Sequence, residues 1–146
     1  MVRQWLLKEN EGSALVEVAL VLPLPLLLAF GVVGVGRVLQ AQMGVSAVAR
    51  EAARSATLAQ DAGEASARGL AVGQAVARGY GLTNGSLSLV VDAGAFDRGG
   101  AVQAVARYDV ALGDLPLMRW VHASVGSEHV ERIDLYRSRW PTGGRP

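Results

Sequence analysis

The sequence predicts an α+β protein with a long N-terminal transmembrane helix, a second helix and a small antiparallel three-stranded sheet. Three observations predict it: nineteen consecutive uncharged residues from Val18 to Gly36, apolar residues at helical spacing after Arg37, and alternating segments in the C-terminal half. The 146 residues are 51% hydrophobic but include only 3 Trp, 3 Tyr and 2 Phe. Ala and Gly supply much of the rest, so we expect a core of small side chains.

The uncharged run favours a membrane-spanning helix. At about 1.5 Å per residue it extends about 28 Å, close to the thickness of a hydrocarbon core. A secretory signal peptide would have a shorter apolar core, and a buried helix of a soluble protein is the other alternative. Pro23 and Pro25 predict a kink within the run. Positive residues lie on both sides of the run, so counting them does not predict the orientation.

The periodicity after Arg37 indicates that the helix continues beyond the membrane. Apolar residues recur every three or four positions, which is one helical stripe: Val38, Ala41, Val45, Val48, Ala52, Ala56 and Ala59. We therefore expect one helix over residues 13–60, with its membrane part at about 18–36. A second helix is predicted from Ala62 to Arg78, with an apolar face formed by Ala65, Val72, Val76 and Tyr80.

Three later segments alternate in the manner of half-buried strands. They lie at residues 87–91, at 102–112 after the Gly99-Gly100 turn, and at 121–125 with a continuation toward Ile133. Residues 61–136 are therefore expected to form a small α+β domain, followed by a disordered tail at 137–146.

Several classes of function are excluded or disfavoured by what the sequence lacks. There are no cysteines, and 14 basic against 13 acidic residues give no sign of a nucleic-acid partner. If His122 and His129 share one strand, their spacing of seven puts them on opposite faces, which disfavours a metal site. No phosphate-binding loop, nucleophile elbow or zinc motif is present. We therefore expect no catalytic residue, cofactor or metal.

One motif precedes the apolar run, and it contains Gly12, Ser13 and Glu17. A carboxylate at the mouth of a membrane helix is either a headgroup-level residue or the partner of a cation. The arrangement resembles the class III signal of type IV prepilins, in which a prepilin peptidase cuts after the glycine. That resemblance implies a cytoplasmic leader at residues 1–12, a free α-amine on Ser13, and subunit pairing through Glu17.

More of the chain is similar to the TadE-like minor pseudopilins of tight-adherence (Tad/Flp) pilus systems. The similarity runs from Glu11 to about Thr57 and includes Gly36-Arg37 and the segment from Ala49 to Ala56. It implies a pilin-like helix and a non-enzymatic minor subunit or assembly factor of a pilus. The protein would cross the inner membrane once and carry its C-terminal domain outside the cytoplasm. Implied partners are the prepilin peptidase, other Tad pilus subunits, the inner-membrane assembly platform and membrane lipid.

Two rival classes remain. One is an uncleaved, signal-anchored membrane protein with a small extracytoplasmic binding domain. The other is an enzyme, which the lack of converging polar residues disfavours.

Overall fold

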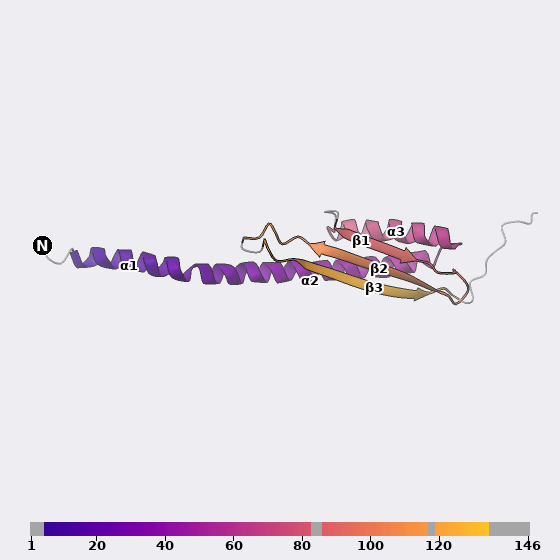
Figure 1. Cartoon of the computed structure of the whole chain (residues 1–146), viewed down its shortest axis with the longest axis horizontal. Coiled ribbons are helices and arrows are strands. Elements are labelled where there is room, and N and C mark those ends of the chain that lie inside the picture. Colours follow the sequence, from indigo (N-terminus) through magenta and orange to yellow (C-terminus); the bar gives the residue numbers. More distant parts are fainter. Residues whose placement is uncertain (1–4, 83–85, 117–118, 135–146) are drawn as a thin grey trace, which may run out of the picture. The chain divides into compact units, whose positions relative to one another are not determined.

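A computed structural model describes residues 5–82, 86–116 and 119–134, and for Trp5–Glu11 it describes the backbone alone (Figure 1). Its elements, in order, are α1 (Trp5–Val21), α2 (Pro23–Ala56), α3 (Ala62–Gly79), β1 (Leu87–Asp92), β2 (Ala101–Val110) and β3 (Ala123–Arg132). The α+β prediction is confirmed. The predicted disordered tail at 137–146 lies outside the described residues.

The chain divides into two compact units. The anchor unit contains the chain up to Arg37 together with Leu112–Val121, and the sheet unit contains Val38–Ala111 and the chain from His122 onward. By packing, the second half of α2 belongs with the sheet, and the extracytoplasmic domain at 61–136 stays a prediction. The proposed borders of the leader and the membrane part remain predictions.

In the anchor unit, the long helix is interrupted only at Leu22. The helix predicted over residues 13–60 is observed as α1 and α2, which begin earlier, at Trp5, and end at Ala56. Pro23 and Pro25 cannot donate backbone hydrogen bonds to the carbonyls four residues earlier, which disturbs the ladder at this point. The Leu22 amide still donates to Val18 at 2.8 Å, but the bond from Leu26 to Leu22 is stretched to 3.4 Å.

In the sheet unit, the three strands are antiparallel and their order is β1-β2-β3. Val90 of β1 lies opposite Val105 of β2, which lies opposite Glu128 of β3. The side chains on one face are buried, notably Val91, Val102, Ala104 and Ala106. This face packs with α3 and the second half of α2, and the amide side chain of Gln42 on α2 donates to the Gly126 carbonyl of β3 at 3.2 Å.

The helical stripe predicted after Arg37 is confirmed, and it is wider than predicted. Six of its seven members are buried, and Ala49 and Ala53 are buried beside them. The largest fully buried side chains are Val45, Val48 and Val102. The core is therefore built from small side chains, as the composition predicts.

The apolar face predicted for α3 overlaps the buried face but is not centred on it. The buried residues are Ala65, Gly69, Gly73 and Ala77, whereas Val72 and Val76 are half-buried and Tyr80 is exposed. The glycines bring the helix backbone close to its neighbours. A Cβ on Gly69 would lie 3.0 Å from the Ala52 carbonyl oxygen and 3.0 Å from a methyl of Val91. The face of α3 that packs is therefore the one whose glycines let its backbone approach α2 and the sheet closely, and not the one with the largest side chains.

Candidate membrane anchor and N-terminal site

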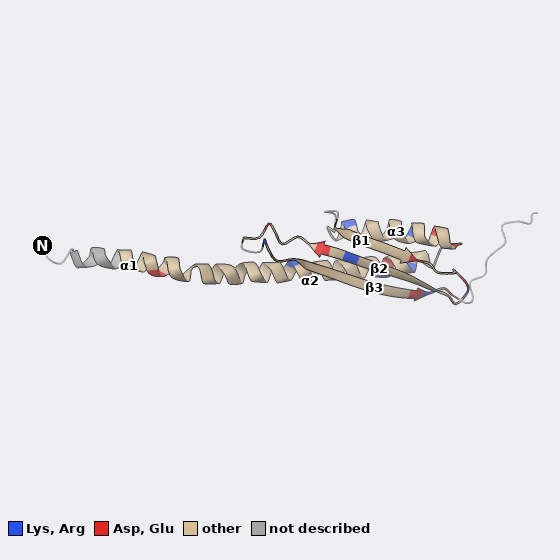
Figure 2. Ribbon diagram, in the orientation of Figure 1, with Lys and Arg blue, Asp and Glu red and all other residues tan. Residues whose placement is uncertain are grey.

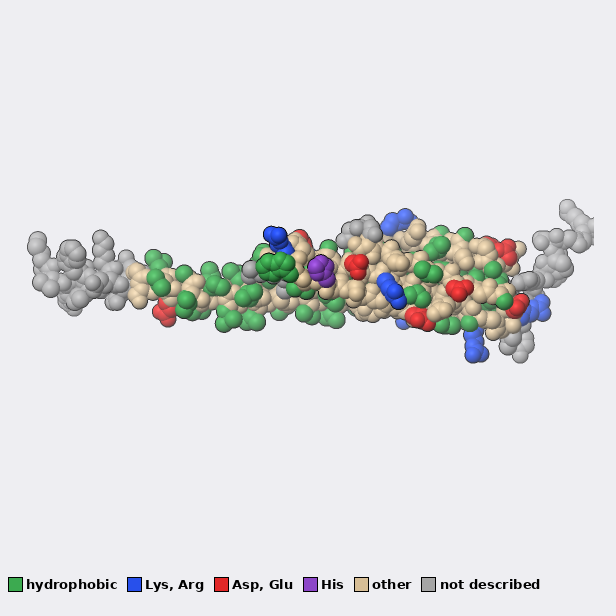
Figure 3. Space-filling view, in the orientation of Figure 1, with side chains coloured by type: hydrophobic (Ala, Val, Ile, Leu, Met, Phe, Trp, Pro, Cys, Tyr) green, Lys and Arg blue, Asp and Glu red, His purple; other side chains and the backbone are tan. Residues whose placement is uncertain are grey.

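The apolar side chains of the anchor helix are exposed. Leu20, Leu24 and Val32 are 80%, 63% and 73% exposed, and Figure 3 shows apolar side chains along α1 and the first half of α2. Within the described part of the chain, one helix is long and apolar enough to cross a membrane, and only 6% of its most apolar window is buried. The core helix of a soluble protein would be mostly buried. The exposure therefore favours a single membrane anchor.

Charge follows the same division along the chain. Charged side chains are sparse along the described part of α1 and the first half of α2, and they gather on the sheet unit (Figure 2). Glu17 is the only charged residue between Gly12 and Gly36. A lone carboxylate at this place is costly in lipid unless it is paired or lies near the headgroups.

The three residues of the N-terminal motif all lie on α1 and are exposed. Added atoms at Gly12 would meet nothing within 4 Å, so the glycine is not required by packing in the chain itself. Ser13 and Glu17 are four residues apart, which places them on the same face of the helix, one turn from each other. Helical side chains lean toward the N-terminus, so the Glu17 side chain extends toward the Ser13 turn.

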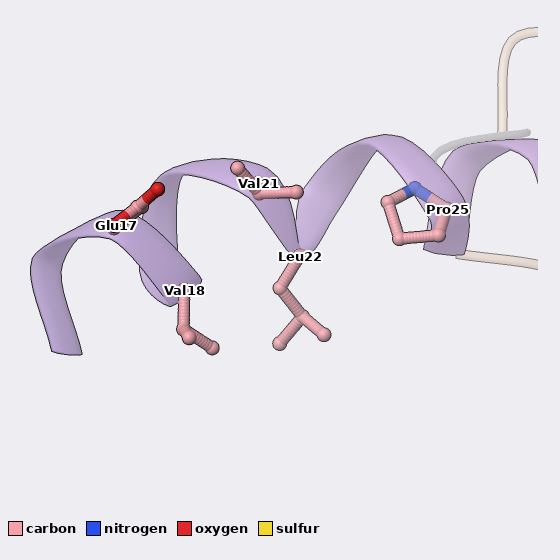
Figure 4. Close-up of a pocket in the computed structure, with 5 residues that line it drawn as sticks. All are labelled: Glu17, Val18, Val21, Leu22 and Pro25. Atoms are coloured by element: carbon pink, nitrogen blue, oxygen red, sulfur yellow. The ribbon is translucent and has the colours of Figure 1, made fainter. Parts of the chain in front are cut away.

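Beside Glu17 the helix surface carries a shallow, mostly apolar groove. It is lined by Glu17, Val18, Val21, Leu22 and Pro25. In Figure 4, Glu17 and Val21 lie on one side of the helix, and Val18 and Leu22 lie on the other. Such a depression between two rows of side chains is where a side chain of another helix can insert. Glu17 is the only ionisable group among the lining residues, so the groove suits packing and not acid–base chemistry.

Arg37 ends the uncharged run and forms an ion pair within the anchor unit. Its Nη1 lies 2.6 Å from Oδ1 of Asp114, in the segment that follows β2. The hydrogen bond from Arg37 holds the pKa of the Asp114 carboxyl below its ordinary value. Sequence reasoning noted Arg37 but missed Asp114, because a segment without periodicity carries no signal of what it contacts.

The two histidines are not placed as the sequence predicts. His122 precedes β3 and is exposed, so the two do not share a strand; His129 lies within β3, with its Nε2 3.2 Å from Oε2 of Glu131. Among the described residues, no group of three or more His, Asp or Glu side chains could hold a metal ion.

The outer face of the sheet has a polar hollow. It is lined by backbone and side chains from the three strands and their flanks: Ser86, Ser88, Arg107, Tyr108, Asp109, Ser124, Val125 and Gly126. Gly126 lies opposite Arg107 across the β2–β3 pair, and an added Cβ there would already contact the Arg107 side chain at 3.5 Å. The alternating pattern predicted these strands, but it did not single out this group of residues.

Comparison with known proteins adds one match. Residues 12–54 match a family model described as "TadE-like protein", which confirms the resemblance found in the sequence. No curated protein and no solved structure gives a significant match. The matched segment begins at the glycine of the N-terminal motif and covers the exposed half of the long helix and most of its buried half.

Proposed function

Because residues 12–54 match the family model described as "TadE-like protein", we propose that this chain is a minor pseudopilin or assembly factor of a Tad/Flp-type pilus. It has no catalytic role and acts by packing its helix in the membrane and against other subunits. It crosses the inner membrane once and holds its C-terminal domain outside the cytoplasm. The observation that carries the proposal lies within the matched segment. It is an exposed apolar helix that follows Gly12, Ser13 and Glu17.

Processing by a prepilin peptidase would occur between Gly12 and Ser13. This peptide bond lies inside α1, so the helix has to open locally before the bond enters an active site. Gly12 lowers the cost of opening, since a glycine in a helix interior is about 0.5–1 kcal/mol less favourable than alanine. Cleavage would release residues 1–12 and leave a positively charged amine at the new N-terminus, Ser13.

The freed amine would give Glu17 a cationic partner. The two groups would be one turn apart on one face of the helix, in the same chain, or could meet across neighbouring subunits. An exposed ion pair contributes about 0–1 kcal/mol, whereas removing one member of a buried pair leaves a charge that costs about 3–5 kcal/mol. In lipid, subunits would therefore assemble only in arrangements that keep the Ser13 amine and the Glu17 carboxylate together.

The groove next to Glu17 supports helix packing as the mechanism. Its walls are apolar and its one charged group would be neutralised by the Ser13 amine, so a neighbouring helix could cover it without burying an unpaired charge. The inner-membrane platform and other pilus subunits are the partners we propose for this surface, and the prepilin peptidase is the partner for Gly12.

The decisive experiment is mass spectrometry of the membrane-extracted chain, co-expressed with the peptidase of its own pilus system. Ser13 should be the first residue. An intact Met1 or Val2 terminus would favour the alternative, an uncleaved signal-anchored protein with a small binding domain. A terminus near Val32 would identify a secretory peptide.

The same preparations test Glu17. The Glu17→Ala variant should still insert into the membrane, because the segment becomes more apolar, but it should lose co-purification with the pilus machinery. Glu17→Asp should lose less, since it keeps the charge on a shorter side chain. Leu20→Ala is a matched control that truncates an exposed neighbour and leaves the pair intact. If Glu17→Ala co-purifies as well as the parent chain, the pairing mechanism is wrong.

A further inference from the structure

The segment between β2 and β3 belongs to the anchor unit and lies on its helix. Leu112 and Leu115 are buried, and the Leu115 amide donates to the Leu112 carbonyl at 3.1 Å. Gly34 on α2 is also buried, and Phe30 is half-buried. Leu112–Val121 groups with the helix up to Arg37, so the burial near Phe30 and Gly34 fits a segment that lies along this part of the helix.

The ion pair between Arg37 and Asp114 fixes the position of the segment between β2 and β3 along the helix axis. Asp114 binds Arg37, the residue at which the uncharged run ends. Phe30 lies seven residues before Arg37, which is about 10 Å along a helix axis. The segment therefore lies beside the last two turns of the apolar run.

This position limits how deep the helix can enter a membrane. A non-helical segment exposed to lipid cannot lie in the hydrocarbon core, because its backbone groups would lack hydrogen-bond partners there. If the helix spans a membrane as proposed, the hydrocarbon core would end near Phe30. Residues 14–30 then provide about 25 Å of helix, at the short end of what spans a bilayer. The segment would then fall in the headgroup layer.

The residues that the segment turns outward fit that layer. Trp120 is 78% exposed, Val121 is 47% exposed, and Arg119 is exposed beside them. An indole ring combines a large apolar surface with one N–H donor, and tryptophan is enriched at membrane–water interfaces for that reason. Arginine beside it can bind lipid phosphate groups while its stem covers apolar surface.

We propose that Arg119–Val121 is a membrane-interface anchor, with Trp120 inserted among the phospholipid headgroups. The ion pair between Asp114 and Arg37 would hold Arg119–Val121 at one depth in the membrane. It would thereby set the residue at which the helix leaves the lipid. The proposal rests on the membrane-anchoring part of the proposed function, but it needs neither cleavage at Gly12 nor a pilus partner.

The test is lipid quenching of tryptophan fluorescence, with the full chain reconstituted in phosphatidylcholine vesicles that contain some phosphatidylglycerol. Trp5→Phe and Trp140→Phe leave Trp120 as the only tryptophan. Lipids brominated near the headgroup should quench Trp120 more than lipids brominated near the chain ends. The emission maximum of Trp120 should lie at a shorter wavelength than that of a fully hydrated indole. Acrylamide, a water-soluble quencher, should quench this emission only weakly.

Two reporters in a background that also carries Trp120→Phe serve as references. Leu24→Trp, on the exposed anchor helix, should be quenched most by the deeply brominated lipids. Val90→Trp, at an exposed position on β1, should respond to acrylamide and not to brominated lipid. Adding Asp114→Asn to the Trp120 reporter should weaken its shallow quenching, because the tie to Arg37 is lost.

The outcomes separate the two proposals. If Leu24→Trp is quenched by deep lipids while Trp120 responds to acrylamide alone, the interface anchor is overturned and the membrane helix stands. If neither reporter is quenched by lipid, the membrane anchoring itself fails, and the interface anchor fails with it.

Discussion

The two halves of α2 are both apolar, but they meet different surroundings. In residues 23–37 the apolar side chains are large and exposed, as at Leu24 and Leu28. In residues 38–56 the buried apolar side chains are small, as at Val48, Ala49 and Ala52, each 0% exposed, and only Leu39 and Met43 are large and exposed. Apolar character alone therefore does not tell whether a helix faces lipid or protein.

Side-chain size and the position of charges separate the two halves. Small residues let α3 and the sheet approach the helix closely, and exposed Arg50 and Arg54 give the second half a solvated face. Residues 23–36 carry no charge, and their leucine side chains are exposed. Leucine-rich surface on all sides is what a lipid-facing helix presents.

A single aspartate placed in each half should give the largest contrast. Val48→Asp buries an unpaired charge and should destabilise the sheet unit by about 3–5 kcal/mol. Leu27→Asp should leave the sheet unit folded but cost about 2.5–3.5 kcal/mol in membrane insertion. Hydrogen exchange of the β2 amides in mild detergent measures the first effect, and flotation with vesicles measures the second. If the β2 amides were equally protected from exchange in both variants, the assignment of one half of α2 to the sheet unit and the other half to lipid would be contradicted.

Enlarging an alanine should sharpen the comparison. Ala52→Leu adds volume to a fully buried position and should cost the sheet unit about 1–3 kcal/mol through overpacking. Ala29→Leu makes the same change at an exposed position on the anchor helix and should leave thermal unfolding of the sheet unit unchanged. Circular dichroism melts of both variants in the same detergent make the comparison. A melt of Ala52→Leu that matches the parent would show that the helix contact is loosely packed.

Sequence reasoning found the elements because each has a strong period or composition. The uncharged run located the anchor, the three-and-four spacing located the buried stripe of α2, and alternation located the three strands. It placed the packing face of α3 off centre because it followed Val72 and Val76, which are half-buried, whereas the tight contact uses Gly69 and Gly73. A glycine contact is invisible until the neighbouring backbone is known.

The candidate site divides in the same way. Gly12, Ser13 and Glu17 form a local motif, so their shared exposure on α1 could be anticipated from helical spacing. The ion pair between Arg37 and Asp114, by contrast, joins residues that are 77 positions apart in the sequence. Asp114 lies in a segment with no period, so nothing in the sequence indicates which charge it meets.

Glycine-to-alanine changes should give a smaller contrast. At Gly69 the added methyl meets backbone and a branched side chain at 3.0 Å, so overpacking of about 1–3 kcal/mol outweighs a helix-propensity gain of about 1 kcal/mol. Gly31→Ala meets nothing within 4 Å, so we expect the propensity gain alone, confined to the anchor helix. Chemical denaturation of the two variants in parallel tests this difference. An unchanged midpoint for Gly69→Ala would mean that α3 shifts at little cost.

The smallest effect should come from the exposed pair in the anchor unit. The hydrogen bond from Arg37 holds the pKa of Asp114 below the ordinary aspartate value, so ionised Asp114 favours the folded segment. This contribution is complete above the pKa of an unfolded aspartate and is lost as the pH falls through the lowered folded value. Carbon-13 NMR of the Asp114 carboxyl, with the full chain in neutral micelles, should show a low titration midpoint. Arg37→Gln should raise that midpoint toward the ordinary value, and Arg54→Gln, a matched change on the sheet-unit half of the helix, should not. If Asp114 titrates identically in all three chains, the pair does not hold the segment to the helix in solution, and the depth assigned to Trp120 loses its support.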